Sequence, residues 1–284
     1  MKAKLIDGKA YAAVVRSTVK DELTELGEQV GLATVLVGDD PASAIYVRRK
    51  QEACIEVGIE PFHHELAGPT SERELLDLVG QLNGDDSVTG ILVQLPLPDH
   101  IDEARVIQSI APIKDVDGFH PINAGHLLQG TDALVPATPA GIMDLLRAYD
   151  VALEGKRAVV VGRSNIVGKP IAILLLAAHA TVTVCHSRTV GLVDVVREAD
   201  VVVAAVGKAG SITAEMIKDG ATVIDVGTNR TDDGLVGDVA PDVADVAGLL
   251  TPVPGGVGPM TIATLLRNTA KAARYQRGLI AFPA

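Results

Sequence analysis

Short apolar runs rich in β-branched residues alternate with amphipathic segments along the whole chain. In the first half they predict strands at 32–38, 61–67 and 88–98 and helices at 39–59 and 71–83. In the second half they predict strands at 157–162, 180–185, 199–207 and 221–227, helices starting near Pro170, Gly191 and Thr213, and a long helix after a glycine-rich loop within 251–276. Strands and helices in alternation are typical of βαβ units.

The order of these elements predicts an α/β fold with two α/β domains, the second a Rossmann-like doubly wound parallel sheet. We expect the first domain to comprise residues 1–120 and 262–284, because the last helix can return to it, and the second to comprise residues 121–261. A length of 284 residues suits two domains of ordinary size. The hydrophobic content of 48% and the 28 glycines suit buried parallel strands and tight strand-to-helix turns.

Apolar runs in this sequence are too short for a membrane span, which needs about 20 residues. The longest candidate, IAILLLAA, stops at His179, and the first ten residues have no signal-peptide core. We therefore expect a cytoplasmic protein with no membrane association. The formal net charge of −11, without a compensating basic patch, argues against a nucleic-acid partner.

The cysteines and histidines do not suggest a metal site. Cys54 and Cys185 lie far apart in the sequence, so neither a disulfide framework nor a CxxC site is indicated, and both are interpreted as small buried side chains. His63 and His64 are adjacent on a predicted strand and therefore point to opposite faces of the sheet. No HExxH motif or carboxylate cluster accompanies them, so no metal is assigned.

The segment VVVGRSNIVGKP follows a predicted strand and precedes a predicted helix, which is the context of a phosphate-binding turn. Its spacing differs from GxGxxG, because five residues separate Gly162 from Gly168. The alternative is an ordinary turn that uses glycines only for its geometry. Strands also end at Gly207 and Gly227, where either a close cofactor approach or a plain turn accounts for the glycine.

The nucleotide is expected to be NADP. Arg163 follows the first glycine, and the next strand ends in CHSRT, which places Ser187 and Arg188 near the adenosine ribose of a Rossmann domain. Arginines and a hydroxyl favour a 2′-phosphate, whereas an acidic residue would repel it. The alternative is that both arginines are solvated surface charges. The expected cofactor contacts are Gly162, Arg163, Ser164, Val167, Gly168, Ser187, Arg188, Gly207, Gly227 and Thr228.

In the first half, Tyr46 and Lys50 form an i, i+4 pair that projects from one face of a predicted helix. Taken alone, such a pair is more often a surface lysine lying over a ring. Arg48 and Arg49 bring like charge close to Lys50, which disfavours its ammonium form and can supply a neutral amine as a base. Gln94, near the carboxyl end of an apolar strand, needs a partner if it is buried, and a lysine amine or a ligand would serve.

Five motifs, in this order, carry a resemblance to a known family: YVRRK, GILVQLPLP, KDVDGFHPIN, GRSNIVGKP and TPVPGGVGPMT. From about Gly38 to Asn268, the chain resembles the bifunctional methylenetetrahydrofolate dehydrogenase/cyclohydrolase family, often called FolD. The resemblance implies that 5,10-methylenetetrahydrofolate is oxidised by NADP to 5,10-methenyltetrahydrofolate, which is hydrolysed to 10-formyltetrahydrofolate at the same site. That site would lie in a cleft between a folate-binding catalytic domain, the first, and an NADP-binding domain, the second.

The resemblance also implies roles for particular residues. Lys50 is the key catalytic group, Tyr46 packs over the aminobenzoyl ring of the folate, and Gln94 holds and tunes the lysine. Asp117 binds the pterin edge, so Lys50, Gln94, Tyr46 and Asp117 are the expected catalytic residues. A homodimer formed through the NADP-binding domains is also implied. The expected substrate-binding residues are Tyr46, Lys50, Val93, Gln94, Leu95, Asp117, Pro254, Gly255 and Gly256.

One departure and two alternatives accompany this interpretation. Where the family commonly has PCTP, this chain has PATP, with Ala137 in place of the cysteine, so no thiol chemistry is assigned there. A shikimate-type dehydrogenase with a similar two-domain plan would leave the Gln94 strand and the PGGVGP loop unexplained. A folate-binding regulatory protein without catalysis would be favoured by the loss of Lys50, which is present.

Overall fold

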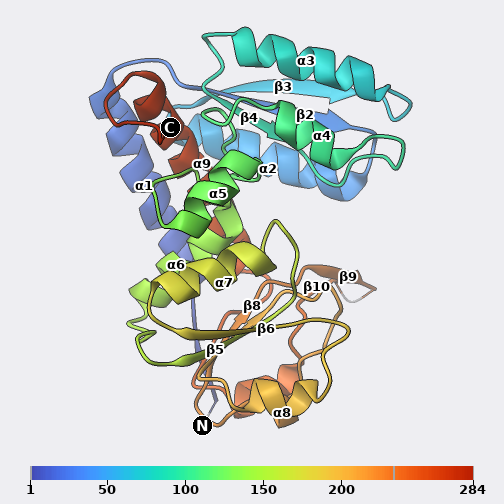
Figure 1. Cartoon of the computed structure of the whole chain (residues 1–284), viewed down its shortest axis with the longest axis vertical. Helices are drawn as coiled ribbons and strands as arrows, with labels where there is room; N and C mark the ends of the chain where they lie inside the picture. The colour runs from blue at the N-terminus through green and yellow to red at the C-terminus, as the bar shows by residue number, and fades with distance from the viewer. Residues whose placement is uncertain (1, 233, 284) are drawn as a thin grey trace. The chain divides into compact units, whose positions relative to one another are not determined.

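The structure, a computed structural model, describes residues 2–232 and 234–283. The chain divides into two compact units: unit 1 comprises Met1–Ala13 and Thr138–Thr261, and unit 2 comprises Val14–Ala137 and Ile262–Ala284. Two helices begin in unit 1 and end in unit 2, namely α1 (Gly8–Leu26) and α9 (Val257–Gln276) (Figure 1).

The units divide the chain at other residues than the domain boundaries expected from the sequence. The N-terminal residues belong to unit 1, because strand β1 (Lys4–Leu5) pairs with β11 (Leu249–Leu250). Residues 121–137 belong to unit 2, where Asn268 Nδ2 on α9 donates to Val116 O and Val135 O, both at 2.8 Å. Pairing partners far along the chain thus decide both differences.

Unit 1 is built on a six-stranded parallel sheet. Its strands lie in the order β1, β11, β8 (Thr222–Asp225), β7 (Val201–Ala204), β5 (Arg157–Val161) and β6 (Thr181–Cys185). The chain leaves β5 for β6 on one side and later returns to pair β7 on the other, so the strand order reverses between β5 and β7. In open parallel sheets, ligands bind beyond the carboxyl ends of the strands at such a switch point.

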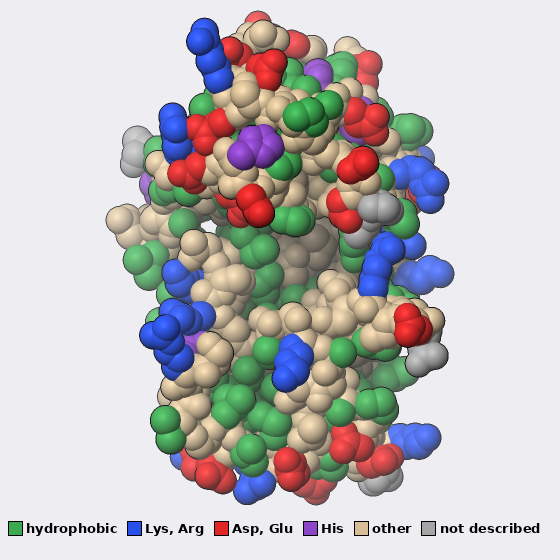
Figure 2. Space-filling model, turned by 90° about the vertical axis from the view of Figure 1, so that its right-hand side faces the viewer, with side chains coloured by type: hydrophobic (Ala, Val, Ile, Leu, Met, Phe, Trp, Pro, Cys, Tyr) green, Lys and Arg blue, Asp and Glu red, His purple; other side chains and the backbone are tan. Residues whose placement is uncertain are grey.

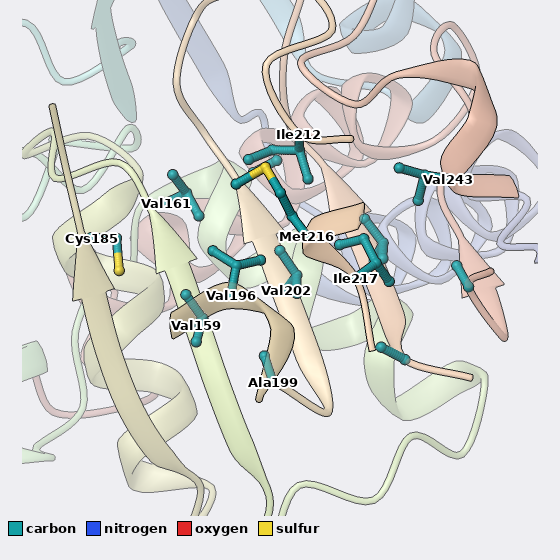
Figure 3. Packing of buried hydrophobic residues seen from close by; sticks show 14 residues of the cluster. Val159, Val161, Cys185, Val196, Ala199, Val202, Ile212, Met216, Ile217 and Val243 are labelled. Atoms are coloured by element: carbon teal, nitrogen blue, oxygen red, sulfur yellow. The ribbon is translucent and has the colours of Figure 1, made fainter. Parts of the chain in front are cut away.

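Helices cover both faces of this sheet. Figure 1 shows α7 (Gly168–Ala177) on one side of β5 and β6 and α8 (Leu192–Arg197) on the other. On the α8 face, Figure 3 shows Val196 and Met216 beside Val159, Val161 and Val202 of the sheet, and Val243 belongs to the same cluster. Because each fully buried side chain of this size contributes about 1.5–3 kcal/mol, the cluster fixes the strands and hence the loops at their ends. The buried residues of the cluster are Val159, Val161, Cys185, Val196, Ala199, Val202, Ala204, Ile212, Met216, Ile217, Ala221, Val223, Val243 and Ala247.

Unit 2 is built on a three-stranded parallel sheet in the order β3 (Glu60–Leu66), β2 (Gly31–Val37) and β4 (Gly90–Val93). Figure 1 shows α2 (Pro41–Val57) and α3 (Glu72–Gly84) on opposite sides of it. Its other helices include α4 (Glu103–Ser109) and α5 (Pro121–Gln129). Leu75, Val79 and Leu82 of α3 pack against alternate residues of β2 and β4, as the helical and strand periodicities require.

Helices α2 and α3 of unit 2 begin where the sequence indicates. Asp40 caps α2 by accepting from Ser43 N, and Gly58 ends it in the left-handed conformation (φ 91°). Ser71 and Glu74 form a capping box at the start of α3, so the predicted start at Ser71 is confirmed.

Several predicted elements differ in extent, and others were missed. The strand expected at 88–98 ends at Val93, since the prolines at 96 and 98 cannot donate to a ladder. The helix expected from Thr213 is a single 3₁₀ turn, η1 (Ala214–Met216). Helices α1, α4, α5 and α6 (Ala137–Ala148), the 3₁₀ turn η2 (Pro241–Asp245) and the hairpin of β9 (Asn229–Thr231) and β10 (Gly234–Val236) were not predicted. Among the described residues, no helix combines the length and apolar character needed to cross a bilayer.

The buried Lys114 donates hydrogen bonds to carbonyl groups at the C-terminal end of α3, and its loss should lower stability. Lys114 is 7% exposed, and its Nζ donates to Leu82 O (3.1 Å) and Asp85 O (2.7 Å). Lys114→Met should destabilise the protein by about 1–3 kcal/mol, because two carbonyls lose a charged donor. Urea unfolding at pH 7 measures the change, with the exposed Lys20→Met as the matched control. A loss no larger than that of the control would show that water replaces the ammonium at no cost.

Candidate active site

The lysine of the YVRRK motif lies inside unit 2 and is held by one side chain. Lys50, on α2, is 9% exposed, and its Nζ donates to Gln94 Oε1 over 3.0 Å. Gln94 follows β4 directly; its backbone N–H donates to Val35 O (2.8 Å) and its Nε2 to Leu95 O (2.7 Å). Because the amide nitrogen is engaged by a carbonyl, the amide oxygen faces the lysine. The expected contact between Gln94 and Lys50 is confirmed.

The pKa of Lys50 is lowered, but the cause inferred from the sequence is wrong. Burial lowers the pKa of Lys50, and the carboxyl of Asp117 acts in the opposite direction. Arg48 and Arg49 are exposed, and Arg48 Nε lies 3.8 Å from Glu52 Oε1. Solvent therefore screens their charges, because side chains one and two positions before Lys50 project from other parts of the helix surface. Desolvation, rather than repulsion, favours the neutral amine.

Asp117 is the acidic counterpart of this lysine. Burial raises the pKa of Asp117 to about 6, with the charge of Asp115 adding to the rise and that of Lys50 opposing it. Both groups are therefore shifted toward their neutral forms, as low-polarity surroundings require. Cys54, one helical turn after Lys50, is buried, and burial raises its pKa to about 12, so it carries a neutral thiol.

The turn that carries Asp117 is held in place by the buried carboxylate of Asp115. Asp115 is 1% exposed, and its Oδ2 accepts from His120 N (2.7 Å) and Asn123 Nδ2 (2.8 Å). Gly118 has φ 73°, and a Cβ there would lie 2.6 Å from Leu134 O. The turn therefore needs glycine for both its conformation and its close packing. The segment KDVDG, which usually indicates only an acidic turn, is here a rigid support for one side chain.

The remaining predicted residues of unit 2 surround this group unequally. Tyr46 is partly exposed and lies one helical turn before Lys50 on α2. Val93 is buried at the end of β4, and Leu95 packs against the core of the sheet. In the structure, Lys50 is hydrogen-bonded to Gln94 and interacts electrostatically with Asp117. Tyr46 lies on the same face of α2 as the lysine.

In unit 1, the glycines of VVVGRSNIVGKP permit close backbone packing at the switch point. A Cβ on Gly162, which follows β5, would overlap the carbonyl oxygen of Ala205 beyond β7, and a Cβ on Gly168 would overlap Gly162 O. Ser164 Oγ accepts from Val167 N and Gly168 N, both at 3.2 Å, and so satisfies two backbone donors at the start of α7. The loop is a tight cradle at a helix N-terminus, the kind of site that suits a phosphate.

The three residues expected to read the 2′-phosphate are all exposed. Arg163 belongs to the loop after β5, while Ser187 and Arg188 follow β6. Gly162 N donates to Cys185 O (2.9 Å), so the ends of these two strands are adjacent. His186 Nδ1 accepts from Arg188 N (3.1 Å) and shapes the turn that presents Ser187.

The other predicted cofactor residues lie at the ends of β7 and β8. Gly207 has φ 73° in the loop after β7, and Gly227 and Thr228 follow β8. Pro254, Gly255 and Gly256 also belong to unit 1, whereas Lys50 belongs to unit 2.

Sequence reasoning missed two buried carboxylates beside these glycines, those of Asp225 and Asp238, which are 4% and 0% exposed. The signal available was weak: an aspartate at the end of the apolar run VID, and another in an otherwise unremarked loop. Among the described residues, no three His, Cys, Asp or Glu side chains are grouped so as to hold a metal ion.

Residues 136–277 match the NAD(P)-binding domain of the tetrahydrofolate dehydrogenase/cyclohydrolase family. This match assigns the six-stranded sheet to nicotinamide nucleotide binding, so the chain is a nicotinamide-nucleotide-dependent α/β enzyme. Residues 6–117 match the catalytic domain of the same family. The chain belongs to the tetrahydrofolate dehydrogenase/cyclohydrolase family.

Individual relatives agree with this assignment. The "Bifunctional protein FolD" of Moorella thermoacetica is 58% identical over 279 residues, which cover 96% of this chain and all of that protein. The crystal structure of the bifunctional FolD enzyme of Campylobacter jejuni has 49% identity and a TM-score of 0.94, covering 96% of this chain and 99% of the other. The FolD structure of Trypanosoma brucei, complexed with NADP and an inhibitor, has 41% identity and a TM-score of 0.92, covering 99% and 100%.

The family predicted from the five motifs is confirmed, and with it the α/β fold class. The enzyme class, an NADP-dependent methylenetetrahydrofolate dehydrogenase and methenyltetrahydrofolate cyclohydrolase of one-carbon metabolism, is confirmed at the level of the family. The shikimate-type alternative is wrong for this chain.

Proposed function

We propose that this chain oxidises 5,10-methylenetetrahydrofolate to 5,10-methenyltetrahydrofolate with NADP, and then hydrolyses it to 10-formyltetrahydrofolate with Lys50 as the base. The observation that carries the proposal is the buried Lys50 amine, held 3.0 Å from Gln94 Oε1 and shifted toward its neutral form. A neutral amine can accept a proton near neutral pH, and it does not repel a cationic methenyl group. Unit 2 is then the folate-binding catalytic domain and unit 1 the NADP-binding domain.

The residues around Lys50 have complementary roles in this proposal. Tyr46 provides an aromatic face for the aminobenzoyl ring, and Asp117 accepts hydrogen bonds from the pterin edge. Val93 and Leu95 flank Gln94 in unit 2 and are assigned to folate binding. Pro254, Gly255 and Gly256, in the glycine-rich loop of unit 1, are assigned to folate binding as well. Gln94 Oε1 can only accept a hydrogen bond, so it holds one N–H of Lys50 and thereby orients the lone pair of the amine.

The residues of unit 1 fit a nicotinamide dinucleotide. Gly162 and Gly168 lie in the loop at the N-terminus of α7, where the backbone leaves no room for a Cβ at either position. The positive end of the helix dipole at this terminus favours a bound phosphate. When bound, NADP accepts the hydride that leaves the one-carbon bridge. Ser164, Val167, Gly207, Gly227 and Thr228 would hold its pyrophosphate and nicotinamide portions, and Arg163, Ser187 and Arg188 its 2′-phosphate.

The proposed function is tested by two initial-rate measurements on the purified protein. Reduced-cofactor formation from 5,10-methylenetetrahydrofolate is followed in parallel with NADP and NAD, and methenyl hydrolysis is followed in the absence of any cofactor. We expect both activities, with NADP the better oxidant. Folded protein that hydrolyses the methenyl compound but reduces neither nucleotide would restrict the function to a cyclohydrolase.

NADP preference supplies a sharper prediction. Arg163→Ala should raise the KM for NADP about 10- to 100-fold, because a charge-assisted hydrogen bond to phosphate is worth about 1.5–3 kcal/mol. The KM for NAD should change by less than about threefold. Arg157→Ala is the matched control, since this arginine lies at the opposite end of β5 and pairs with Glu198 (2.6 Å). Equal losses with both nucleotides would refute the assignment of Arg163 to the 2′-phosphate.

The proposal includes a cytoplasmic homodimer that binds neither membranes nor nucleic acid. The face shown in Figure 2 carries both Asp and Glu and Lys and Arg side chains, and the net charge of the chain is −11. This net charge disfavours a polyanionic partner. Sedimentation equilibrium measures the oligomeric state; a monomer at micromolar concentration would contradict the dimer.

A further inference from the structure

A buried carboxylate gathers the backbone of the loop that follows β7. Asp238 is fully buried. Its Oδ2 accepts from Val206 N (2.6 Å) and Gly207 N (2.8 Å), and its Oδ1 accepts from Lys208 N (2.9 Å). Three successive N–H groups that converge on one anion form a nest, and the left-handed φ of Gly207 (73°) makes such a turn possible. Asp238 thus determines the conformation of residues 206–208.

The same carboxylate also holds the loop that follows β8. Asn229 Nδ2 donates to Asp238 Oδ1 over 2.9 Å. A Cβ on Gly227 would overlap that oxygen, so the backbone of residue 227 passes directly against the carboxylate. One side chain therefore sets the conformation of two neighbouring loops, residues 206–208 and 227–229.

A second carboxylate fixes the first. Asp225 Oδ1 accepts from Asp238 N and Gly227 N, both at 2.9 Å, and Asp225 Oδ2 accepts from Val239 N over 3.0 Å. Burial raises the pKa of Asp225 to about 6, and the charge of Asp238 adds to the rise. Two carboxylates buried beside each other are costly, and the converging backbone donors offset that cost.

These two loops lie at the carboxyl ends of β7 and β8, on one side of the switch point. Gly162, on the other side, packs against Ala205, the residue that precedes the 206–208 loop. The acceptor capacity of Asp238 is used by four donors of the protein itself, so its carboxylate is not directed at a ligand. Its influence on a cofactor passes through Gly207, Gly227 and Thr228, which it positions.

We infer that Asp238 is a positioning residue for the nicotinamide nucleotide, holding the loops after β7 and β8 in the conformation that binds it. The inference rests on the proposed function, which assigns Gly207, Gly227 and Thr228 to the cofactor. A general structural role would lower every activity together with stability. A positioning role affects cofactor binding and spares the hydrolysis step, which needs no cofactor.

The test compares Asp238→Asn with Asp200→Asn. The amide nitrogen introduced at 238 faces backbone donors that need an acceptor, so the loops must move. We expect the KM for NADP to rise about 10- to 100-fold, with methenyl hydrolysis and the KM for the folate changed less than about twofold. Asp200 accepts hydrogen bonds from Arg157 N (3.0 Å) and from Lys218 Nζ (2.6 Å). It is a suitable control because it lies at the opposite end of the sheet. Its variant should leave the KM for NADP unchanged.

The outcomes separate this inference from the proposed function. Wild-type protein that does not reduce NADP would overturn the proposed function, and the inference with it, before any variant is compared. If wild-type reduces NADP, an unchanged KM in Asp238→Asn, or equal losses of both activities, overturns the inference alone. Should Asp238→Asn fail to fold, Asn229→Ala removes one of the four donors; a KM for NADP raised about threefold or more at an unchanged melting temperature supports positioning, and an unchanged KM overturns it.

Discussion

Lys50→Met is expected to lower the rate of methenyl hydrolysis by about 10²- to 10⁴-fold, the range that a positioned general base contributes. Methionine matches the length and apolar character of the buried stem but cannot accept a proton. The dehydrogenase rate should fall by at least about tenfold, because the proposed function places the same side chain beside the folate. Folding should be retained, since the substitution removes a buried amine whose ionisation burial already disfavours.

Arg48→Met is the matched control for Lys50→Met. It removes a cation from the same helix at an exposed position, so both activities should stay within about twofold of wild type. A hydrolysis rate that survives in Lys50→Met would remove the lysine from catalysis. A large loss of activity in Arg48→Met would instead show that the positive charge of Arg48 acts on Lys50.

Asp117→Asn should lower kcat/KM for the folate about 10- to 100-fold and change its pH dependence. In wild type, kcat/KM should fall as the pH decreases through about 6, because the carboxylate that we propose accepts from the pterin becomes protonated. The folded pKa lies above the ordinary value of 3.8, so the ionised form also costs stability, and this cost appears as the pH rises from about 4 to 6. The asparagine variant has no such titration.

The pH profile of each protein, measured from pH 5 to 8 with the folate below its KM, tests this prediction. Asp144→Asn serves as a control, because Asp144 pairs with Arg147 (2.8 Å) on α6 in unit 1. A limb near pH 6 that persists unchanged in Asp117→Asn would assign it to another group and remove Asp117 from pterin recognition.

The sequence predicted those parts of the site that depend on short-range spacing. An i, i+4 pair on a helix and a glutamine near the end of an apolar strand made Lys50 and Gln94 candidates, and the family resemblance implied the contact between them that the structure has. The cause of the lowered lysine pKa was not predictable, because burial depends on how α2 packs, and arginines near in sequence gave a misleading explanation. The role of Asp238 was not predicted for a similar reason, because its three backbone donors lie about thirty residues earlier in the chain.

The same distinction holds for the fold. Buried parallel strands such as β5 and β7 contain continuous runs of apolar residues and were predicted, whereas β1 has only two residues and depends on β11. Helix α1 was not predicted, and its sequence, GKAYAAVVRSTVKDELTEL, has no acidic first turn and no basic last turn, which is also true of the predicted helix α2. A strand as short as β1 gains its conformation from a partner that a local pattern does not contain.

The two glycines against the buried carboxylates restrict how this sequence can vary over time. A Cβ on Gly237 would overlap Asp225 Oδ2, and one on Gly227 would overlap Asp238 Oδ1. If either glycine is replaced before its carboxylate, the carboxylate must move. If either carboxylate is removed before its glycine, several backbone N–H donors lose their acceptor. Single steps in both directions are therefore unfavourable, and the cost of the paired changes is strongly non-additive. Homologues that have drifted here should have changed glycine and aspartate together, leaving a covarying pair.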